Sequence, residues 1–299
     1  MTPRPQSQDG SDPDGPEHLF AGKSWQGHPE PLALNPTHIA DLQTLGNDLL
    51  AFLKACDSLY QLSAEGRQPT FVADWLDRGK PPHLVAIGRA KPLRNQIPRV
   101  IRPDILLTDR GFCITEIDSI PGGIGLTAAL YLQHEYRNTK LWGSSTAFVR
   151  GFASIVGKGT ILVSKEAETY LPEMRWMSDR IGATVSPAEN ACPDSHQPTY
   201  RFFELFDLGN IPGSVPLIEA AATGSIILSP PPKAYLEEKM WFAFLRYRPL
   251  RAYWRRTLGD RIFHRMLALL PETWIIDPAP IPPHAVHPGL EINSWDELR

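Results

Sequence analysis

The sequence predicts an α/β fold, because three kinds of segment follow one another along its 299 residues. A β-hairpin pattern lies near residues 100–118. Strands then alternate with helices over residues 159–232, at a spacing typical of a mainly parallel sheet. A long helical segment closes the chain. This length suffices for one large or two ordinary domains, each with its own core.

The N-terminal part changes character near residue 35. Residues 1–35 are rich in Pro, Gly, Ser and Asp and contain few apolar side chains, so burial cannot offset the entropy of ordering them. We therefore expect a disordered tail. Asn35-Pro36-Thr37 then offers a helix start, and apolar residues follow at helical spacing as far as Cys56. A short second helix is predicted over residues 71–76.

The segments VIRPDILL and FCITEID flank TDRG, which predicts a β-hairpin. Gly111 suits the left-handed position of a three-residue loop, Asp109-Arg110-Gly111. That loop pairs Thr108 with Phe112 and fixes the register of the two strands.

The predicted register gathers charge on one face of the hairpin. Asp104 lies opposite Glu116 and Arg102 opposite Asp118, and side chains alternate along a strand, so three carboxylates converge beside an arginine. Like charges opposite each other are unfavourable, and a hard cation such as Mg²⁺ would offset them. The alternative is a solvated polar face on which Arg102 bridges the acids. Cys113 is expected on the opposite face, buried.

The run PGGIG begins shortly after Asp118 and opens a predicted helix over LTAALYLQHEY. Successive glycines let a backbone come close to a ligand, and helix N-termini attract anions, which makes Gly122, Gly123 and Gly125 candidate binding positions. A tight strand-to-helix turn is the alternative that this run favours by itself.

Residues 159–232 carry the alternating pattern. The predicted strands are GTILVS, ATVSP, YRFFELFD and SIILSP, and the predicted helices are residues 166–181, with Gly182 as C-cap, and VPLIEAAATG. From Lys233 to Leu270 the pattern is helical and rich in aromatic residues and arginines.

The stretch RPDILLTDRGFCITEIDSIPGGIG resembles the metal-binding hairpin of circularly permuted ATP-grasp proteins, a group related to glutathionylspermidine synthase. In that family an Asp-bearing strand leads through a turn into a strand with Glu-x-Asn, and these side chains hold the Mg²⁺ ions that grip ATP phosphates. Asp104 and Glu116 match the first two ligands. Asp118 stands where Asn is usual, which keeps an oxygen ligand but adds a charge.

The order of the later segments extends the resemblance to about residues 85–280, with Lys239 matching a Lys-bearing helix of the family. It implies a tail (1–35), an ATP-grasp-like metal-ligand half (36–158), a Rossmann-like domain (159–232) and a helical segment (233–299) leading to a second lobe. That lobe supplies lysines in the family, and no lysine follows Leu270 here. We therefore expect that the chain lacks it.

The resemblance implies an ATP-dependent carboxylate–amine ligase, or part of one, acting through an acylphosphate. ATP and Mg²⁺ would be the cofactors, and a small carboxylic acid and an amine the substrates, with Arg102 positioning phosphate or carboxylate. The alternative is a non-catalytic remnant or subunit of a split ATP-grasp protein. We expect either self-association or a requirement for a second polypeptide that supplies the other lobe. The chain alone should bind Mg-ATP poorly, with aromatic surface around Trp241, Phe242, Phe244 and Trp254 left uncovered.

Composition argues against several other classes of protein. A net charge of -3 and a pI near 6.3 argue against a nucleic-acid or membrane-surface partner. No apolar run reaches the roughly 20 residues that cross a bilayer, and the polar N-terminus lacks a signal core, so the cytoplasm is expected. The three cysteines have neither metal nor disulfide spacing.

Overall fold

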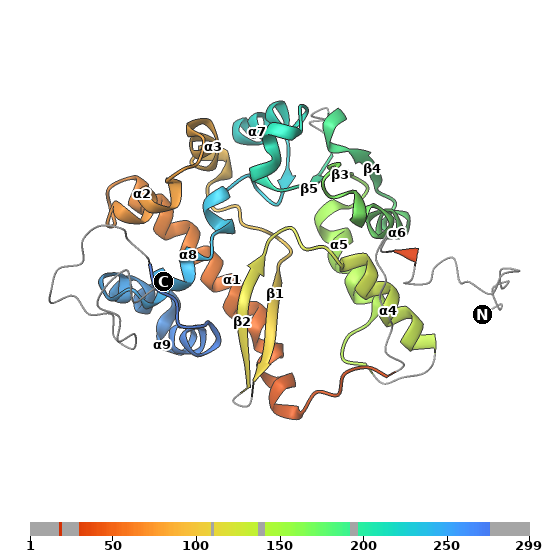
Figure 1. Cartoon of the computed structure of the whole chain (residues 1–299), viewed down its shortest axis with the longest axis horizontal. Helices are drawn as coiled ribbons and strands as arrows, with labels where there is room; N and C mark the ends of the chain where they lie inside the picture. Colours follow the sequence, from red (N-terminus) through yellow and green to blue (C-terminus); the bar gives the residue numbers. More distant parts are fainter. Residues whose placement is uncertain (1–17, 20–29, 109–110, 137–140, 192–196, 276–299) are drawn as a thin grey trace, which may run out of the picture.

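The computed structural model describes residues 18–19, 30–108, 111–136, 141–191 and 197–275. Its fold is mixed α/β, as predicted, with a two-stranded antiparallel hairpin and a four-stranded parallel sheet among many helices. Figure 1 shows the hairpin in the middle of the molecule, with one group of helices on its left and the parallel sheet on its right.

The first lobe joins segments from both ends of the chain around one apolar core. Asn35 begins the long helix α1 as its N-cap, its side chain accepting a hydrogen bond from the His38 amide at 2.8 Å. The core lies between the helices and the hairpin. The elements of this lobe are α1 (Pro36–Ala64), α2 (Phe71–Asp77), β1 (Arg102–Thr108), β2 (Gly111–Asp118), α8 (Met240–Arg246) and α9 (Arg251–Leu269).

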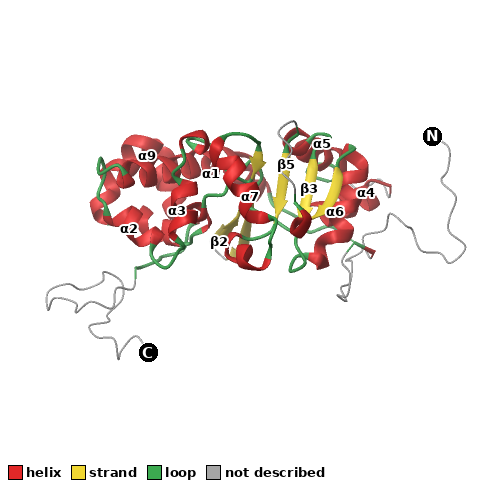
Figure 2. Ribbon diagram, turned by 90° about the horizontal axis from the view of Figure 1, so that it is seen from above, coloured by secondary structure: helices red, strands yellow, loops and turns green. Residues whose placement is uncertain are grey.

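The second lobe is built on a parallel sheet of strand order β4-β3-β5-β6. Ile161 and Val163 pack into the core under α4, α5 and α6, whereas Leu162 points into the core under α3 and α7. Both faces of the sheet are therefore covered, as Figure 2 shows from above. The elements are α3 (Pro82–Gly88), α4 (Ile124–Tyr136), α5 (Ser145–Val156), β3 (Thr160–Val163), α6 (Leu171–Ile181), β4 (Thr184–Pro187), β5 (Thr199–Phe202), α7 (Ser214–Thr223) and β6 (Leu228–Ser229).

Three predicted elements of this lobe are clearly shorter in the structure, among them the strand SIILSP, of which only Leu228–Ser229 is a strand. The helix expected from residue 166 begins at Leu171, because Pro172 suits the first turn of a helix; it ends at Gly182, whose left-handed φ of 73° confirms the predicted C-cap. The strand expected over YRFFELFD stops at Phe202, and a 3-10 helix over Leu205–Asn210 follows it.

The expected division of the chain needs correction at both boundaries. Helices α4 and α5, placed with the metal-ligand half by the sequence, pack on the parallel sheet instead. Helices α8 and α9 fold back against α1 and the hairpin. The expectation of an uncovered aromatic surface is therefore wrong: Trp241, Phe242, Phe244 and Trp254 are all buried, because α1 supplies an apolar face for them.

The predicted tail is described only in part. Leu19 is 4% exposed and packs in the core beneath α4, α5 and α6, so this position is not solvated as expected. Residues 1–17 and 20–29 lie outside the described residues, as do residues 109–110 of the predicted turn. No helix in the described part of the chain has the length and apolarity that crossing a membrane requires.

Candidate functional site

The carboxylates of the hairpin are paired as predicted, but the turn and the register near it differ from the prediction. Thr108 pairs with Gly111, one residue short of the predicted partner. A β-bulge at Thr115 then adds one residue to the second strand, which restores the expected opposition of Asp104 with Glu116 and of Arg102 with Asp118. Two shifts in register thus cancel before the charged pairs.

The bulge decides which way the acids point. Phe112 and Ile114 are buried in the core of the first lobe, and regular alternation would aim Glu116 and Asp118 at that same core. The extra residue reverses the alternation, so Ile117 packs against the core and the two acids face away from it. A bulge that re-aims side chains is common beside functional sites.

Cys113 does not lie on the opposite face from the acids. It sits between two core-facing residues, Phe112 and Ile114, and so points to the same side of the hairpin as Glu116 and Asp118. Its thiol is free and its side chain only half-buried. The predicted burial of Cys113 is wrong for the same reason, since the bulge was not foreseen.

The three hairpin carboxylates are neutralised by protein cations. The Arg102 Nε donates to Asp104 Oδ1 at 2.9 Å, and another Arg102 nitrogen lies 3.2 Å from Asp118 Oδ2. The Lys239 Nζ lies 2.9 Å from Glu116 Oε2. Within the described residues, no group of three or more His, Cys, Asp or Glu side chains is arranged to hold a metal ion. In this arrangement the trio does not fit a shared Mg²⁺ ion, and the bridging role weighed for Arg102 accounts for its contacts.

A protein carboxylate occupies the N-terminus of α4, where the glycines are candidate ligand-binding positions by sequence. The buried Glu173 accepts hydrogen bonds from the amides of Gly123, at 2.6 Å, and Leu126, at 3.0 Å. Burial raises the pKa of this carboxyl, and the amide hydrogen bonds oppose the shift. The glycines also permit close packing, because a Cβ at Gly122 would lie 2.4 Å from the Tyr170 ring and one at Gly125 2.5 Å from the Glu173 carbonyl oxygen. Gly123 has a left-handed φ of 87°, so the tight-turn interpretation of PGGIG accounts for all three glycines.

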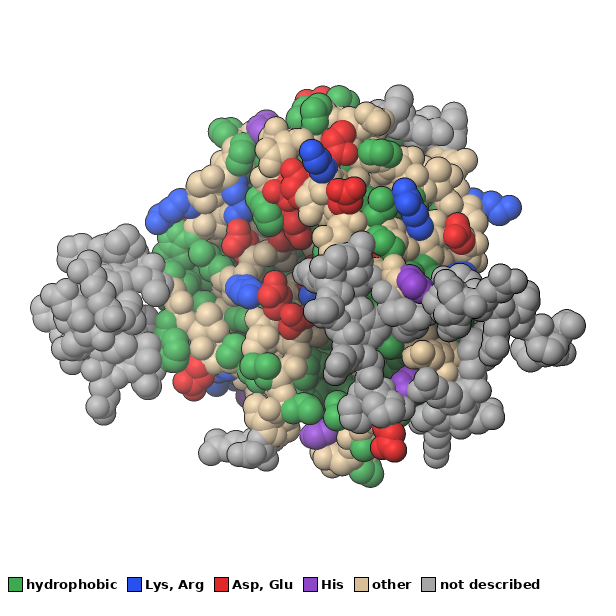
Figure 3. All heavy atoms as spheres, turned by 45° about the vertical axis from the view of Figure 1, so that its right-hand side comes forward, with side chains coloured by type: hydrophobic (Ala, Val, Ile, Leu, Met, Phe, Trp, Pro, Cys, Tyr) green, Lys and Arg blue, Asp and Glu red, His purple; other side chains and the backbone are tan. Residues whose placement is uncertain are grey.

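Glu116 and Asp118 of the hairpin line a cavity of ≈ 650 Å³ between the two lobes. Figure 3 shows acidic side chains gathered on this side of the molecule. Apolar atoms of Leu205, Phe206 and Leu208 form part of the wall. The carboxylates that line the cavity are those of Glu116, Asp118, Glu204, Glu237 and Glu238. Sequence reasoning missed the last three, which follow β5 and precede α8, because only the fold brings them beside the hairpin.

Glu204 differs from the other acids of this cavity. Asp118, Glu116, Glu237 and Glu238 each form an ion pair, with Arg102, Lys239, Arg201 and Lys80 respectively. Glu204 forms none within the part of the chain that the structure describes. Burial first, and then the charge of Glu237, raise the pKa of Glu204 from 4.5 to about 7. A carboxyl that titrates near neutrality in a cavity can accept or release a proton there.

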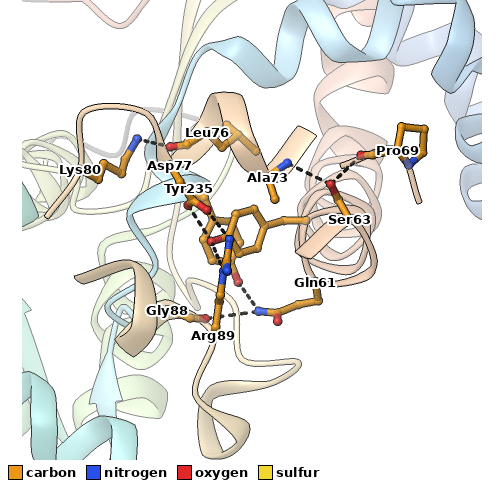
Figure 4. Close-up of polar contacts among 11 residues, drawn as sticks. Gln61, Ser63, Pro69, Ala73, Leu76, Asp77, Lys80, Gly88, Arg89 and Tyr235 are labelled. Atoms are coloured by element: carbon orange, nitrogen blue, oxygen red, sulfur yellow. Dashed lines mark hydrogen bonds and ion pairs between the residues drawn. The ribbon is translucent and has the colours of Figure 1, made fainter. Parts of the chain in front are cut away.

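Buried polar contacts hold the segment that carries Glu237 and Glu238. Gln61 of α1 donates to the Tyr235 hydroxyl at 2.9 Å and to the Gly88 carbonyl at 3.3 Å (Figure 4). The Tyr235 ring stacks on Tyr60 with centroids 3.6 Å apart. Because these groups come from α1, α3 and the turn before α8, they fix the position of the cavity wall.

Arg201 also stabilises this cavity wall, through hydrogen bonds and an ion pair. Its guanidinium is fully buried and donates to the carbonyls of Phe203, at 2.8 Å, and Pro230, at 3.0 Å. It also pairs with Glu237 at 2.5 Å. A neighbouring polar group has no such partner, because the buried Tyr200 hydroxyl makes no hydrogen bond among the described residues. Burial raises the pKa of Tyr200, and the charges of Asp118 and Glu204 add to that shift.

The stability of the protein should depend on the titration of Glu204. Because its folded pKa of about 7 lies above its ordinary 4.5, its stabilising contribution is complete below pH ~4.5 and is lost as the pH rises through about 7. We expect Tm to fall between pH 5 and 8.5, and the fall to be smaller in Glu204→Gln, whose neutral amide cannot titrate. Calorimetry at a series of pH values measures the change of Tm with pH in both proteins.

Glu272→Gln serves as the control, since it removes an exposed acid outside the cavity. In that variant Tm should fall with pH as it does in the unmodified protein. If Tm fell equally with pH in Glu204→Gln and in the unmodified protein, Glu204 would have an ordinary pKa.

The chain matches no protein-family model, and comparisons with curated proteins and with solved structures find no significant similarity. The family resemblance of the hairpin sequence therefore stays a prediction, and the geometry of the cavity is the main guide to function.

Proposed function

We propose that the cavity binds the ammonium group of a small amine beside Glu204, and that the protein is the amine-binding part of an ATP-dependent carboxylate–amine ligase. The observation that carries the proposal is Glu204: an acid without an ion pair among the described residues, in a cavity lined by four further carboxylates. An ammonium ion would supply the missing countercharge.

The chemistry of amide formation suits such a group. An amine becomes a nucleophile only after its ammonium form loses a proton, and the Glu204 carboxylate, with a pKa of about 7, can take that proton near neutral pH. The walls at Leu205, Phe206 and Leu208 would contact the alkyl part of the amine. The other four acids each pair with a protein cation, one of which, Lys80, also lines the cavity, so Glu204 carries the attraction for the ammonium group.

ATP, Mg²⁺ and the carboxylic acid substrate belong to this proposal through the hairpin resemblance. The ATP-grasp-like arrangement is likewise part of the proposal. No step is assigned to Mg²⁺, because the carboxylates of Asp104 and Asp118 are bridged by Arg102 and that of Glu116 is paired with Lys239. An ion would have to displace these cations before it could share the trio.

One observation favours the alternative, a non-catalytic protein of the same descent. The hairpin acids are neutralised, and the α4 amides that would meet a phosphate are used by Glu173. A protein with these features can bind an amine without ATP chemistry. Calorimetric titration with Mg-ATP distinguishes the two: the ligase proposal requires Mg-ATP to bind, alone or with a second polypeptide present, whereas the alternative does not.

The amine site is tested by calorimetric titration at pH 8 with 1,4-diaminobutane and with its neutral counterpart butane-1,4-diol. We expect the diamine to bind and the diol not to. Glu204→Gln should weaken diamine binding roughly tenfold or more, because a charge-assisted hydrogen bond contributes about 1.5–3 kcal/mol. Affinity should also fall at pH 5.5, where Glu204 is protonated.

Glu272→Gln again provides the matched control and should bind the diamine as the unmodified protein does. Equal affinities for diamine and diol, or an unchanged affinity in Glu204→Gln, would refute the assignment of the site.

A further inference from the structure

A second cavity, of ≈ 520 Å³, is lined by Arg102, which pairs with Asp118 of the acidic cavity. Its volume is within the range of about 300–1,000 Å³ typical of small-molecule sites. It runs between the strand entering the hairpin, the PGGIG turn and one side of α5. The apolar side chains that line it are those of Val100, Ile101, Ile124, Phe148, Phe152 and Ile155. None of its lining residues is acidic, in contrast to the cavity beside Glu204.

Gly151 keeps part of this cavity open. It lies inside α5 with an ordinary helical backbone, so its conformation does not require glycine. A Cβ built on it would meet no atom within 4 Å. A glycine inside a helix costs about 1 kcal/mol relative to alanine. Gly151 lines the cavity at an exposed position of α5, next to Phe152 and one turn from Phe148, so a long side chain there would occupy space beside these two rings.

The charged groups of this cavity are both arginines. Arg102 is held by Asp104, Asp118 and the Gly122 carbonyl oxygen. Arg99 donates to the Ser154 carbonyl at 2.7 Å and has no acidic partner in the described part of the chain. An anionic group at Arg99 would therefore find a guanidinium whose charge is not yet matched, at the edge of an apolar wall.

We propose that this cavity binds a free amphiphilic carboxylic acid, with its carboxylate at Arg99 and its apolar tail along α5 past Gly151. The apolar lining contributes through burial of the tail, at about 25 cal/mol per Å² of apolar surface removed from water. The arginine selects acids over alcohols and amines of equal length. This site is separate from the amine site and does not depend on the ligase proposal.

The test compares octanoate, octan-1-ol and octylamine by calorimetry on the full chain. Octanoate should bind most tightly and octylamine least. Arg99→Gln should reduce octanoate affinity about tenfold, the loss of one charge-assisted contact, while leaving octanol affinity within about twofold. Octylamine or octanol binding as tightly as octanoate would overturn the assignment of an acid.

Gly151→Leu tests the position of the tail. Its side chain should fill the cavity and reduce octanoate binding at least tenfold, while Tm stays the same or rises because leucine favours the helix. Gly46→Leu is the matched control, since Gly46 is also a helix glycine with no atom within 4 Å of a built Cβ but lies in α1, away from the cavity. Unchanged octanoate binding in a folded Gly151→Leu variant would refute the proposed site.

Discussion

Replacing Lys233 with methionine is expected to lower the free energy of unfolding by about 3–5 kcal/mol. Lys233 is 1% exposed, and its Nζ donates to Asp57 Oδ1 and to the Gln96 carbonyl, both at 2.6 Å. Burial lowers the pKa of Lys233, and the nearby charge of Asp57 opposes that shift. Without the lysine, the buried Asp57 carboxylate loses its countercharge and, among the described residues, keeps only the Tyr235 hydroxyl as a side-chain donor. Urea unfolding measures the loss.

Lys239→Met is the control for this variant. Its side chain is 63% exposed and pairs with Glu116 across the surface, so we expect a loss below about 1 kcal/mol. The double variant Asp57→Leu/Lys233→Met should cost less than the sum of the single changes, because both members of the pair are removed together. Equal losses in Lys233→Met and Lys239→Met would mean that the buried pair contributes little.

Trp254→Ala is expected to destabilise the fold by about 3–5 kcal/mol, the usual cost of removing a large aromatic side chain from a core. Trp254 is fully buried, its ring lies 5.7 Å from that of Phe52 in α1, and its Nε1 donates to the Phe244 carbonyl at 2.8 Å. The variant would leave a cavity between α1, α8 and α9, and the Phe244 carbonyl would keep only its hydrogen bond from the Tyr247 amide, at 3.2 Å, among the described residues. Guanidinium unfolding, followed by circular dichroism, gives the change.

Phe206→Ala is the comparison, because Phe206 is 82% exposed and its loss should change stability by no more than about 0.5 kcal/mol. A Trp254→Ala variant as stable as Phe206→Ala would contradict the packing of α9 on α1. It would also revive the expectation that the aromatic residues of the C-terminal helices await a partner. The result therefore bears on whether this chain folds by itself.

The amine and acid sites share no lining residue, and their tests are independent. Loss of diamine binding in Glu204→Gln leaves the octanoate site intact, and Gly151→Leu leaves the acidic cavity intact. A protein that binds both ligands would hold an acid in a cavity lined by Arg102 and an amine in the cavity of Asp118, the partner of Arg102. The ligase proposal would then have to connect the two ligands through ATP.

The sequence by itself determined the local elements. Asn35 caps α1, Gly182 ends α6, and the alternation of strands and helices gives a parallel sheet, because capping, left-handed backbone and hydrophobic periodicity act over a few residues. The opposition of Asp104 with Glu116 was also predicted, although the assumed loop was one residue too long and the bulge was not foreseen.

Only the tertiary structure decided how these elements are used. It closed the N- and C-terminal helices around one core, and it placed Glu204 and Glu237, far from the hairpin in sequence, on the wall opposite Asp118. It also placed the Glu173 carboxylate where it accepts hydrogen bonds from the amides of Gly123 and Leu126. Such contacts join residues tens to hundreds of positions apart, and the pKa of Glu204 follows from the burial and charges that they create. No local pattern carries that information.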